Sequence, residues 1–354
     1  MTSNQDVFAE IMAVPPWPVD QLPAGHATPA PSATLNDTLS AAGLADGEAV
    51  GRILSAWEKI FGLARPDLVV ADFAPLAALA ARGRIPLMLV GTGFTIPPAE
   101  MPRFPLLHRI VPPAFDETRT LETVNAAIAK AGLLRLDRLP QLFSGDARLV
   151  QTFPLLDPYD TQRVLPVEGH VFAEPPIPRA ADAKQVFAYL SDDSNAWTFM
   201  LEALILVAKC LRIHAPSWPK APLDQLAELG AVVESTPQPI AAMLAESRLV
   251  VHSGGHGLAA EALAAGVPQL VLADNIERDL YGEALEQAGV ARLVKAYLPG
   301  TRLESNAIQS LVGDYAMAER ADAIGSRLRK FTAGRDALMN CEAVCMSLLK
   351  GNRA

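Results

Sequence analysis

Short apolar runs separated by longer amphipathic segments dominate the chain. In its first half, runs at 68–71, 86–90 and 148–153 predict strands, and the alanine-rich segment at 75–81 predicts a helix between the first two. Strands that are apolar throughout, without alternation, are typical of a parallel sheet covered on both faces. The other helices predicted in this half cover 46–64, 115–131 and a short segment near Leu139.

The second half repeats the alternation with greater regularity, which argues for a doubly wound α/β domain. Three further helices, at 307–312, 315–332 and 335–349, close the chain. The strands predicted in this half are 186–190, 212–215, 231–233, 249–251 and 269–272, and the helices between them are 196–211, 223–229, 240–245, 258–265 and 280–287.

Prolines are distributed unequally between the two halves. Of the 29 prolines, 22 lie at or before Pro178. We therefore expect an extended lead-in over residues 1–40 and a long loop over 95–113, because proline interrupts helices and central strands. We place a first domain at 1–173, a stiff linker at 174–183 and a second domain at 184–335.

The composition excludes one class of binding partner and indicates a cellular compartment. The 354 residues carry a net charge of -9 and only 6% aromatics, so we exclude nucleic acid as a partner. Three cysteines without a C-x-x-C pair, and no signal peptide, predict a cytoplasmic protein without a metal site. The most apolar stretch, 200–211, is too short to cross a membrane.

The sharpest local motif is a glycine-rich turn at 250–258, where an apolar strand leads into a helix. Glycines let a ligand approach the backbone closely, and the free amides at a helix start suit a diphosphate. Tight packing between strand and helix explains the same glycines when the motif is taken alone.

Further residues, at fixed distances from the turn along the sequence, form a longer motif with it. They are Pro237, Gln238, Gly255, Glu261, Gly266-Val267-Pro268 and Glu277. Together they resemble the donor-binding signature of nucleotide-sugar-dependent glycosyltransferases with two Rossmann-like domains (GT-B), closest to the UDP-glycosyltransferase family and its bacterial natural-product relatives. The resemblance implies two doubly wound parallel-sheet domains that face each other across a cleft. It also implies that the last helix, 336–354, packs back on the first domain.

The resemblance also implies roles for individual residues. Glu261 would hold the ribose hydroxyls, Gln238 the ribose or base, and Glu277 the sugar hydroxyls. The diphosphate of a UDP- or dTDP-linked sugar, a co-substrate and not a cofactor, would lie on the turn. The full set implied for the donor is Gln238, Ser253, Gly254, Gly255, His256, Gly257, Leu258, Glu261, Glu277 and Arg278.

Several positions depart from the family pattern. Ser235 stands where the family has a base-stacking Trp, Ser253 where it has a phosphate-contacting His, Leu258 where it has Ser or Thr, and Arg278 where it has Gln. His256 is a substitute for the lost His or a solvated loop residue, and His252 is expected to be structural.

The catalytic dyad of the family is only half present. Asp72 matches the Asp that orients a catalytic His, but no glycine-rich loop with that His is found. His26 lacks a strand before it, and we expect His108 and His170 to lie at the surface. The first domain is therefore expected to lack its opening strand-helix-strand unit, through a late start codon or a truncated gene, in which case a helper protein is a candidate partner.

The function expected from the resemblance is inverting transfer of a sugar to a hydroxyl of a lipophilic small molecule. An inactive relative that acts as a binding or partner protein is the alternative, and a nucleotide-sugar epimerase is a third and weaker one. The acceptor is expected to contact Gly91, Thr92, Gly93, Phe94 and Phe104.

Overall fold

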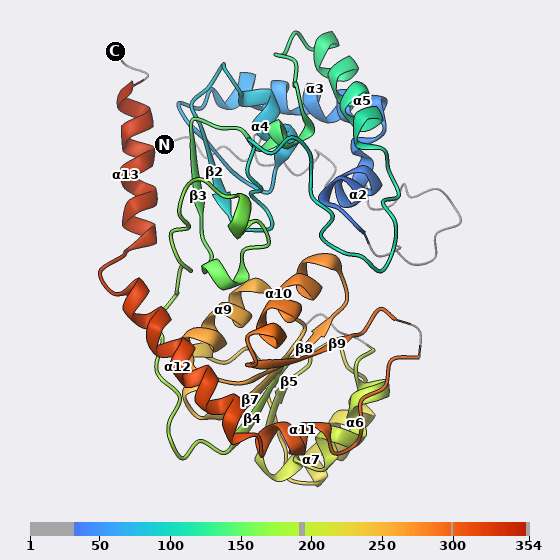
Figure 1. Ribbon diagram of the computed structural model, residues 1–354, viewed down its shortest axis with the longest axis vertical. Helices are drawn as coiled ribbons and strands as arrows, with labels where there is room; N and C mark the ends of the chain where they lie inside the picture. The colour runs from blue at the N-terminus through green and yellow to red at the C-terminus, as the bar shows by residue number, and fades with distance from the viewer. Residues whose placement is uncertain (1–31, 191–194, 299, 352–354) are drawn as a thin grey trace. The chain divides into compact units, whose positions relative to one another are not determined.

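The chain divides into two compact units. The computed structural model describes residues 32–190, 195–298 and 300–351 (Figure 1). Unit 1 comprises Met1–Gln151, Tyr159–Val167 and Ala337–Ala354, and unit 2 comprises Thr152–Pro158 and Glu168–Asp336. Unit 2 thus contains two segments, 152–158 and 168–173, that lie inside the first domain drawn from the sequence. The last helix, α13 (Ala337–Gly351), belongs to unit 1.

The described part of unit 1 contains a three-stranded parallel sheet in the order β1-β2-β3. The predicted strand and helix positions are confirmed here, except that the third strand ends at Val150, three residues before its predicted end. The strands are β1 (Val69–Asp72), β2 (Leu87–Gly91) and β3 (Ala147–Val150), and the helices are α3 (Gly47–Ala64), α4 (Pro75–Ala81), α5 (Glu117–Lys130) and a 3-10 turn at Leu139–Phe143.

A short helix, α2 (Leu35–Leu39), followed by a π-helical turn at Ser40–Leu44, corrects the prediction that the extended lead-in continues to residue 40. The reason is a capping box, in which Thr34 accepts a hydrogen bond from the Asp37 amide. The buried Asp37 carboxylate accepts from the amides of Ala33 and Thr34, both at 3.0 Å, and from those of Ala114 and Phe115 at 2.9 and 3.0 Å. One carboxylate therefore ties the start of α2 to the segment before α5.

Unit 2 is built on a six-stranded parallel sheet in the order β6-β5-β4-β7-β8-β9 (Figure 1). The doubly wound architecture predicted for this half is confirmed. The strand β9 was missed by the sequence analysis because its apolar positions are interrupted by Arg292 and Lys295. The strands are β4 (Gln185–Tyr189), β5 (Leu211–His214), β6 (Val232–Val233), β7 (Ser247–His252), β8 (Gln269–Ala273) and β9 (Ala291–Lys295).

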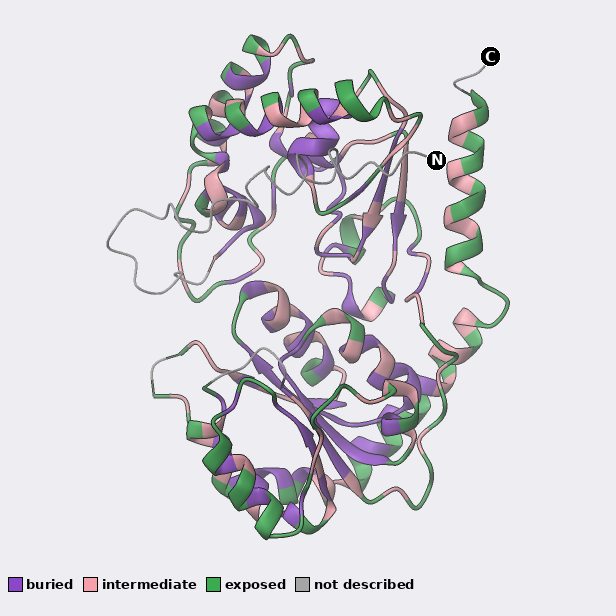
Figure 2. Cartoon of the chain, turned by 180° about the vertical axis from the view of Figure 1, so that it is seen from behind, coloured by how far each residue is buried: buried purple, intermediate pink, exposed green. Residues whose placement is uncertain are grey.

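Helices cover both faces of this sheet, which is buried throughout its central strands (Figure 2). Apolar residues of α6 (Trp197–Ile205), α7 (Lys220–Glu228) and α11 (Ala307–Val312) pack on one face. Those of α8 (Ile240–Ala245) and α9 (His256–Ala265) pack on the face that carries Phe187 and Val250. The middle residues of the central strands, at 186–188, 249–251 and 270–272, are apolar for this reason.

Two helix boundaries in unit 2 differ from the prediction. The helix α6 ends at Ile205, and a 3-10 turn at Ala208–Cys210 replaces the rest of the helix expected over 196–211. The helix α10 (Ile276–Gln287) begins four residues before the predicted start, because Asn275 caps it by accepting from the Arg278 amide. Glu277 and Arg278 therefore lie in a helical first turn.

The helix α12 (Tyr315–Thr332) has the bounds predicted from the sequence and packs along α9, where Gly325 allows its backbone to approach Leu263 and Ala264 closely. None of the helices within residues 32–190, 195–298 and 300–351 is long and apolar enough to cross a membrane.

Candidate functional site

The glycine-rich turn of unit 2 lies where the strand order of the sheet reverses. Strands β4 and β7 are neighbours, with Tyr189 paired to His252 at their carboxyl ends, while β5 continues to one side and β8 to the other. In open α/β sheets, ligands bind at this switch point, outside the carboxyl ends of the strands. Ser253, Gly254 and Gly255 lead from that edge directly into α9.

A buried chain of hydrogen bonds links the glycine turn to β8 and α9. The Gly254 amide donates to Nδ1 of His252 at 3.1 Å, so Nε2 carries the proton and donates to Oε1 of Gln269 at 2.9 Å. The Gln269 amide in turn donates to the Ala259 carbonyl of α9 at 3.2 Å. Burial lowers the pKa of His252 to about 4, so the ring stays neutral near pH 7. The expectation that His252 is structural is confirmed.

The three glycines of the motif differ in their surroundings. Gly254 has φ +83°, and a Cβ added there would lie 2.9 Å from Val271 Cγ1 and 3.0 Å from Arg278 Cβ. Only glycine fits that position without strain. A Cβ on Gly255 or Gly257 would meet nothing within 4 Å. The outer side of the turn is therefore open backbone, and no side chain caps the start of α9.

The first two turns of α9 carry His256 and Glu261. His256 is partly exposed; its Nε2 lies 2.8 Å from Thr152 Oγ1, and burial lowers its pKa to about 3. Its ring packs edge-on against those of His170 and Tyr281, with centroids 5.5 and 5.3 Å away. The ring of His256 is thus held by unit 2 itself.

Neither of the two histidines expected at the surface is exposed: His170 is largely buried and His108 is buried. The His170 side chain is only 11% exposed, and its Nε2 lies 3.8 Å from Oε1 of Glu261. It packs edge-on against Phe172 at 4.8 Å, which explains its burial. His108 is 3% exposed. The sequence analysis was wrong for both, because a loop position by itself does not reveal burial. His26 lies outside the described residues.

The first turn of α10 brings Glu277 and Arg278 beside the glycine turn, through the contact of Arg278 with Gly254. Tyr281, one helical turn further and 1% exposed, donates its hydroxyl to Oε1 of Glu277 at 2.9 Å. Arg278 pairs with Asp274 at 2.9 Å. The sequence motif does not mark Tyr281, although the i to i+4 spacing from Glu277 places both side chains on one helix face.

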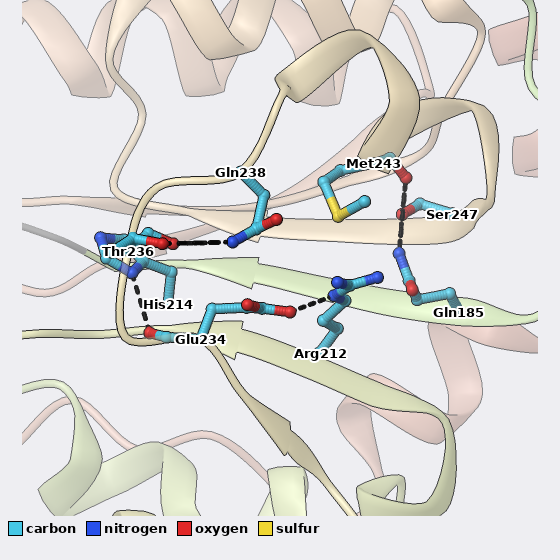
Figure 3. Close-up of polar contacts among 8 residues, drawn as sticks. All are labelled: Gln185, Arg212, His214, Glu234, Thr236, Gln238, Met243 and Ser247. Atoms are coloured by element: carbon cyan, nitrogen blue, oxygen red, sulfur yellow. Dashed lines mark hydrogen bonds and ion pairs between the residues drawn. The ribbon is translucent and has the colours of Figure 1, made fainter.

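Gln238 lies in the loop between β6 and α8, shown in Figure 3. Its side-chain amide donates to the carbonyl of Thr236 at 3.2 Å. At the carboxyl ends of the neighbouring strands β5 and β6, the His214 Nδ1 donates to the Glu234 carbonyl at 3.0 Å, and Arg212 pairs with the Glu234 carboxylate. Among the described residues Gln238 bonds only within its own loop, so the structure does not join it to the glycine turn by a direct contact.

In unit 1, Asp72 and the Gly91 turn lie together at the carboxyl ends of β1 and β2. A Cβ added to Gly91, which has φ +152°, would lie 3.0 Å from Asp72 Oδ1 and would collide with the Thr95 hydroxyl. Thr95 closes the turn by accepting from the Thr92 amide at 2.8 Å. Partial desolvation raises the pKa of the Asp72 carboxyl above its usual value.

A shallow hollow, with room for about one water molecule, lies at the turn from β1 to α4. Phe73, which follows Asp72, and Phe143 line it with nearly parallel rings, inclined by 15° with centroids 6.3 Å apart. The predicted acceptor residues Phe94 and Phe104 are buried behind these rings, at centroid distances of 6.4 Å from Phe73 and 6.2 Å from Phe143 respectively. The Gly93 carbonyl accepts from Arg163.

The chain is similar in sequence to one known family and similar in fold to several solved structures. Residues 220–331 match the family model of the erythromycin biosynthesis protein CIII-like C-terminal domain. No curated protein matches the chain significantly. Among solved structures, the glycotransferase of kitacinnamycin superposes with a TM-score of 0.62 at 17% identity, over 90% of this chain and 84% of that one.

Two further glycosyltransferases show the same likeness. CalG4, the calicheamicin glycosyltransferase, has a TM-score of 0.60 at 18% identity, with 89% of this chain and 81% of that one covered. SnogD from Streptomyces nogalater has a TM-score of 0.51 at 20% identity, with 85% and 80% covered. The chain has the GT-B fold. The resemblance to GT-B natural-product glycosyltransferases stated from the sequence is confirmed, and the family match lies within unit 2.

Within this GT-B chain, the structure gathers the predicted residues into two groups, one in each unit. The glycine turn, Glu261, Glu277 and Arg278 lie at the starts of α9 and α10 in unit 2. Asp72 and the Gly91 turn lie together at the carboxyl ends of β1 and β2 in unit 1. Gln238 is joined to neither group by a direct contact.

Proposed function

We propose that this GT-B protein transfers a sugar from a nucleoside diphosphate sugar, UDP- or dTDP-linked, to a hydroxyl of a lipophilic small molecule, with inversion at the sugar carbon. The observation that carries the proposal is the open, uncapped start of α9 at the switch point of unit 2, with Glu261 on the second turn of that helix. The family match over residues 220–331 supports it.

The roles in unit 2 follow from the chemistry of the residues. Backbone amides from Gly255 to Leu258 would bind the diphosphate, and the positive end of the helix dipole would stabilise the charge that develops on it as the sugar departs. The Glu261 carboxylate would accept hydrogen bonds from the ribose hydroxyls, and that of Glu277 from the sugar hydroxyls. These roles need no metal ion.

The role in unit 1 belongs to Asp72. Attack by the acceptor hydroxyl releases a proton, which a group near the reacting oxygen must take. Partial desolvation raises the pKa of Asp72, which makes its carboxylate a stronger base than a fully solvated aspartate.

Calorimetric titration with UDP and with dTDP tests the donor site. We expect one of them to bind, and Glu261→Ala to weaken that binding by about ten- to a hundredfold, the value of a hydrogen bond to a charged group. Glu319→Ala, which removes an exposed carboxylate from α12 of the same unit, is the matched control and should leave affinity unchanged. Absence of binding by both nucleotides would refute the proposal.

The second candidate is an inactive GT-B relative that binds without catalysis. Ser253 and Leu258, in place of the phosphate-contacting residues of the family, favour it. Nucleotide binding accompanied by no release of UDP or dTDP from the matching glucose donors, in the presence of a panel of phenolic and alicyclic alcohols, would decide for this candidate.

A further inference from the structure

His170 is a largely buried histidine to which the proposed function gives no role. Its side chain is 11% exposed, and its Nε2 atom is buried without a hydrogen-bond partner among the residues that the structure describes. Buried nitrogen and oxygen atoms are almost always hydrogen-bonded, because an unpaired polar group away from water is unfavourable. The unpaired nitrogen therefore needs a physical reason.

The packing of the His170 ring does not supply that reason. The ring lies edge-on to Phe172 at a centroid distance of 4.8 Å, and the rings of His256 and Phe153 lie 5.5 and 6.4 Å away. The nitrogen of His256 is engaged elsewhere, since its Nε2 lies 2.8 Å from Thr152 Oγ1. A phenylalanine at position 170 would pack among these rings without burying a polar atom.

Glu261 faces this nitrogen from the second turn of α9. Its Oε1 lies 3.8 Å from Nε2 of His170, which is longer than a hydrogen bond but within the range of an ion pair. Glu261 makes no hydrogen bond within the described part of the chain, and its side chain is 23% exposed. Two polar groups that lack hydrogen bonds thus face each other, and one of them is open to solvent. Hydrogen bonds at functional sites are often long without ligand and shorten when the ligand binds.

We infer that His170 is a positioning residue of the nucleotide site: its Nε2–H donates to Glu261 and holds the carboxylate against the ribose hydroxyls. The inference rests on the proposed function, which gives Glu261 the ribose. A carboxylate has room for several hydrogen bonds, so Glu261 can accept from His170 and from the ribose at once. A donor on the protein side also limits the rotation of the long acidic side chain, which reduces the entropy lost on binding.

The binding test uses the nucleotide, UDP or dTDP, that binds the full chain in the titration above. His170→Phe keeps an aromatic ring and removes the donor. We expect it to weaken nucleotide binding by about three- to tenfold, the value of a hydrogen bond. His170→Gln places an amide N–H near the position of Nε2, so it should restore the affinity to within about twofold of wild type.

A double-mutant cycle with Glu261→Ala separates positioning from support of the fold. In the Glu261→Ala background, His170→Phe should not weaken nucleotide binding further, because the carboxylate that His170 holds is gone. If His170 only supported the fold, the effect of His170→Phe would add to that of Glu261→Ala.

Urea unfolding of the same four proteins without nucleotide tests the pair itself. In Glu261→Ala the buried nitrogen of His170 no longer faces a carboxylate. His170→Phe should therefore raise the unfolding midpoint more in this background than in the wild-type background.

Equal nucleotide affinity of wild type and His170→Phe, failure of His170→Gln to restore a lost affinity, or additive effects in either cycle would each overturn the inference. Failure of the proposed function gives a different pattern, in which neither nucleotide binds but the urea cycle still shows coupling. That result would refute the role of both residues toward a ribose and leave His170 and Glu261 as a structural pair.

Discussion

The buried imidazole of His252 predicts a specific dependence of stability on pH. In the folded protein its pKa is about 4, against an unperturbed 6.5. Between these values the unfolded chain binds the proton and the folded chain does not, so stability falls as pH falls from about 6.5 to 4. The difference of about 2.5 pKa units corresponds to about 3 kcal/mol at 1.36 kcal/mol per unit. This contribution is complete above pH 6.5 and lost below pH 4.

The matched variant is His252→Gln. A glutamine side chain keeps a donor for Gln269 and an acceptor for the Gly254 amide, but it does not titrate. The variant isolates the contribution of His252 from that of His256, whose lowered pKa has the same sign. We expect the stability advantage of wild-type protein over the variant at pH 7.5 to shrink by about 3 kcal/mol by pH 4.

The assay is urea unfolding across this pH range, with amide exchange of β7 and β8 peptides, corrected for intrinsic exchange rates, as the readout for unit 2. Parallel stability curves for wild type and variant would contradict the reasoning. The imidazole nitrogen resonances provide a direct check, since they should show a neutral ring protonated at Nε2 down to pH 5. An imidazolium signal at pH 6 would also refute it.

Three further predictions follow from contacts described above. Asp37→Asn replaces an acceptor of four amides, so unit 1 should lose about 3 kcal/mol or more in urea unfolding, whereas the N-cap substitution Asp46→Asn should change little. Gly254→Ala should cost about 1–3 kcal/mol through its positive φ and its contact with Val271, and a wild-type midpoint would contradict the packing. Tyr281→Phe removes the hydroxyl that holds the Glu277 carboxylate, so UDP-glucose or dTDP-glucose should bind about three- to tenfold more weakly. The affinity for the free nucleotide should be unaffected. Tyr297→Phe, which removes a hydroxyl bonded to Asp279, is the control.

The sequence predicts the architecture where local pattern and tertiary environment agree. Apolar runs mark the strands of both sheets because parallel strands are buried on two faces. The strand β9 has no continuous apolar run and is not predicted, because it lies at the edge of its sheet, with Arg292 and Lys295 partly exposed. The helix α2 is not predicted either, since a five-residue helix held by Asp37 and Thr34 is too short to show a hydrophobic periodicity.

The site is predictable only as far as it follows from spacing along the chain. The glycine turn, Glu261 and Glu277 are marked by position in a motif. His170 and Tyr281 are not, because their positions in the site depend on burial and on a side chain one helical turn away respectively. Departures from a family pattern likewise do not reveal which neighbours take over a lost contact, and here His256 is held by Thr152.

For the nucleotide binding proposed above, the hydrogen bonds of His252 and Gln269 have a consequence for the rate of association. The Gly254 amide donates to His252, which donates to Gln269, and these buried hydrogen bonds hold Gly254 in place, so we expect no slow ordering step at this turn before an anion arrives. Association at this turn is then governed by diffusion and by charge. With a net charge of -9, the protein repels an anionic nucleotide, and dissolved salt screens that repulsion. Added salt should therefore speed the arrival of the nucleotide, the opposite of what is found for electrostatically attracted ligands.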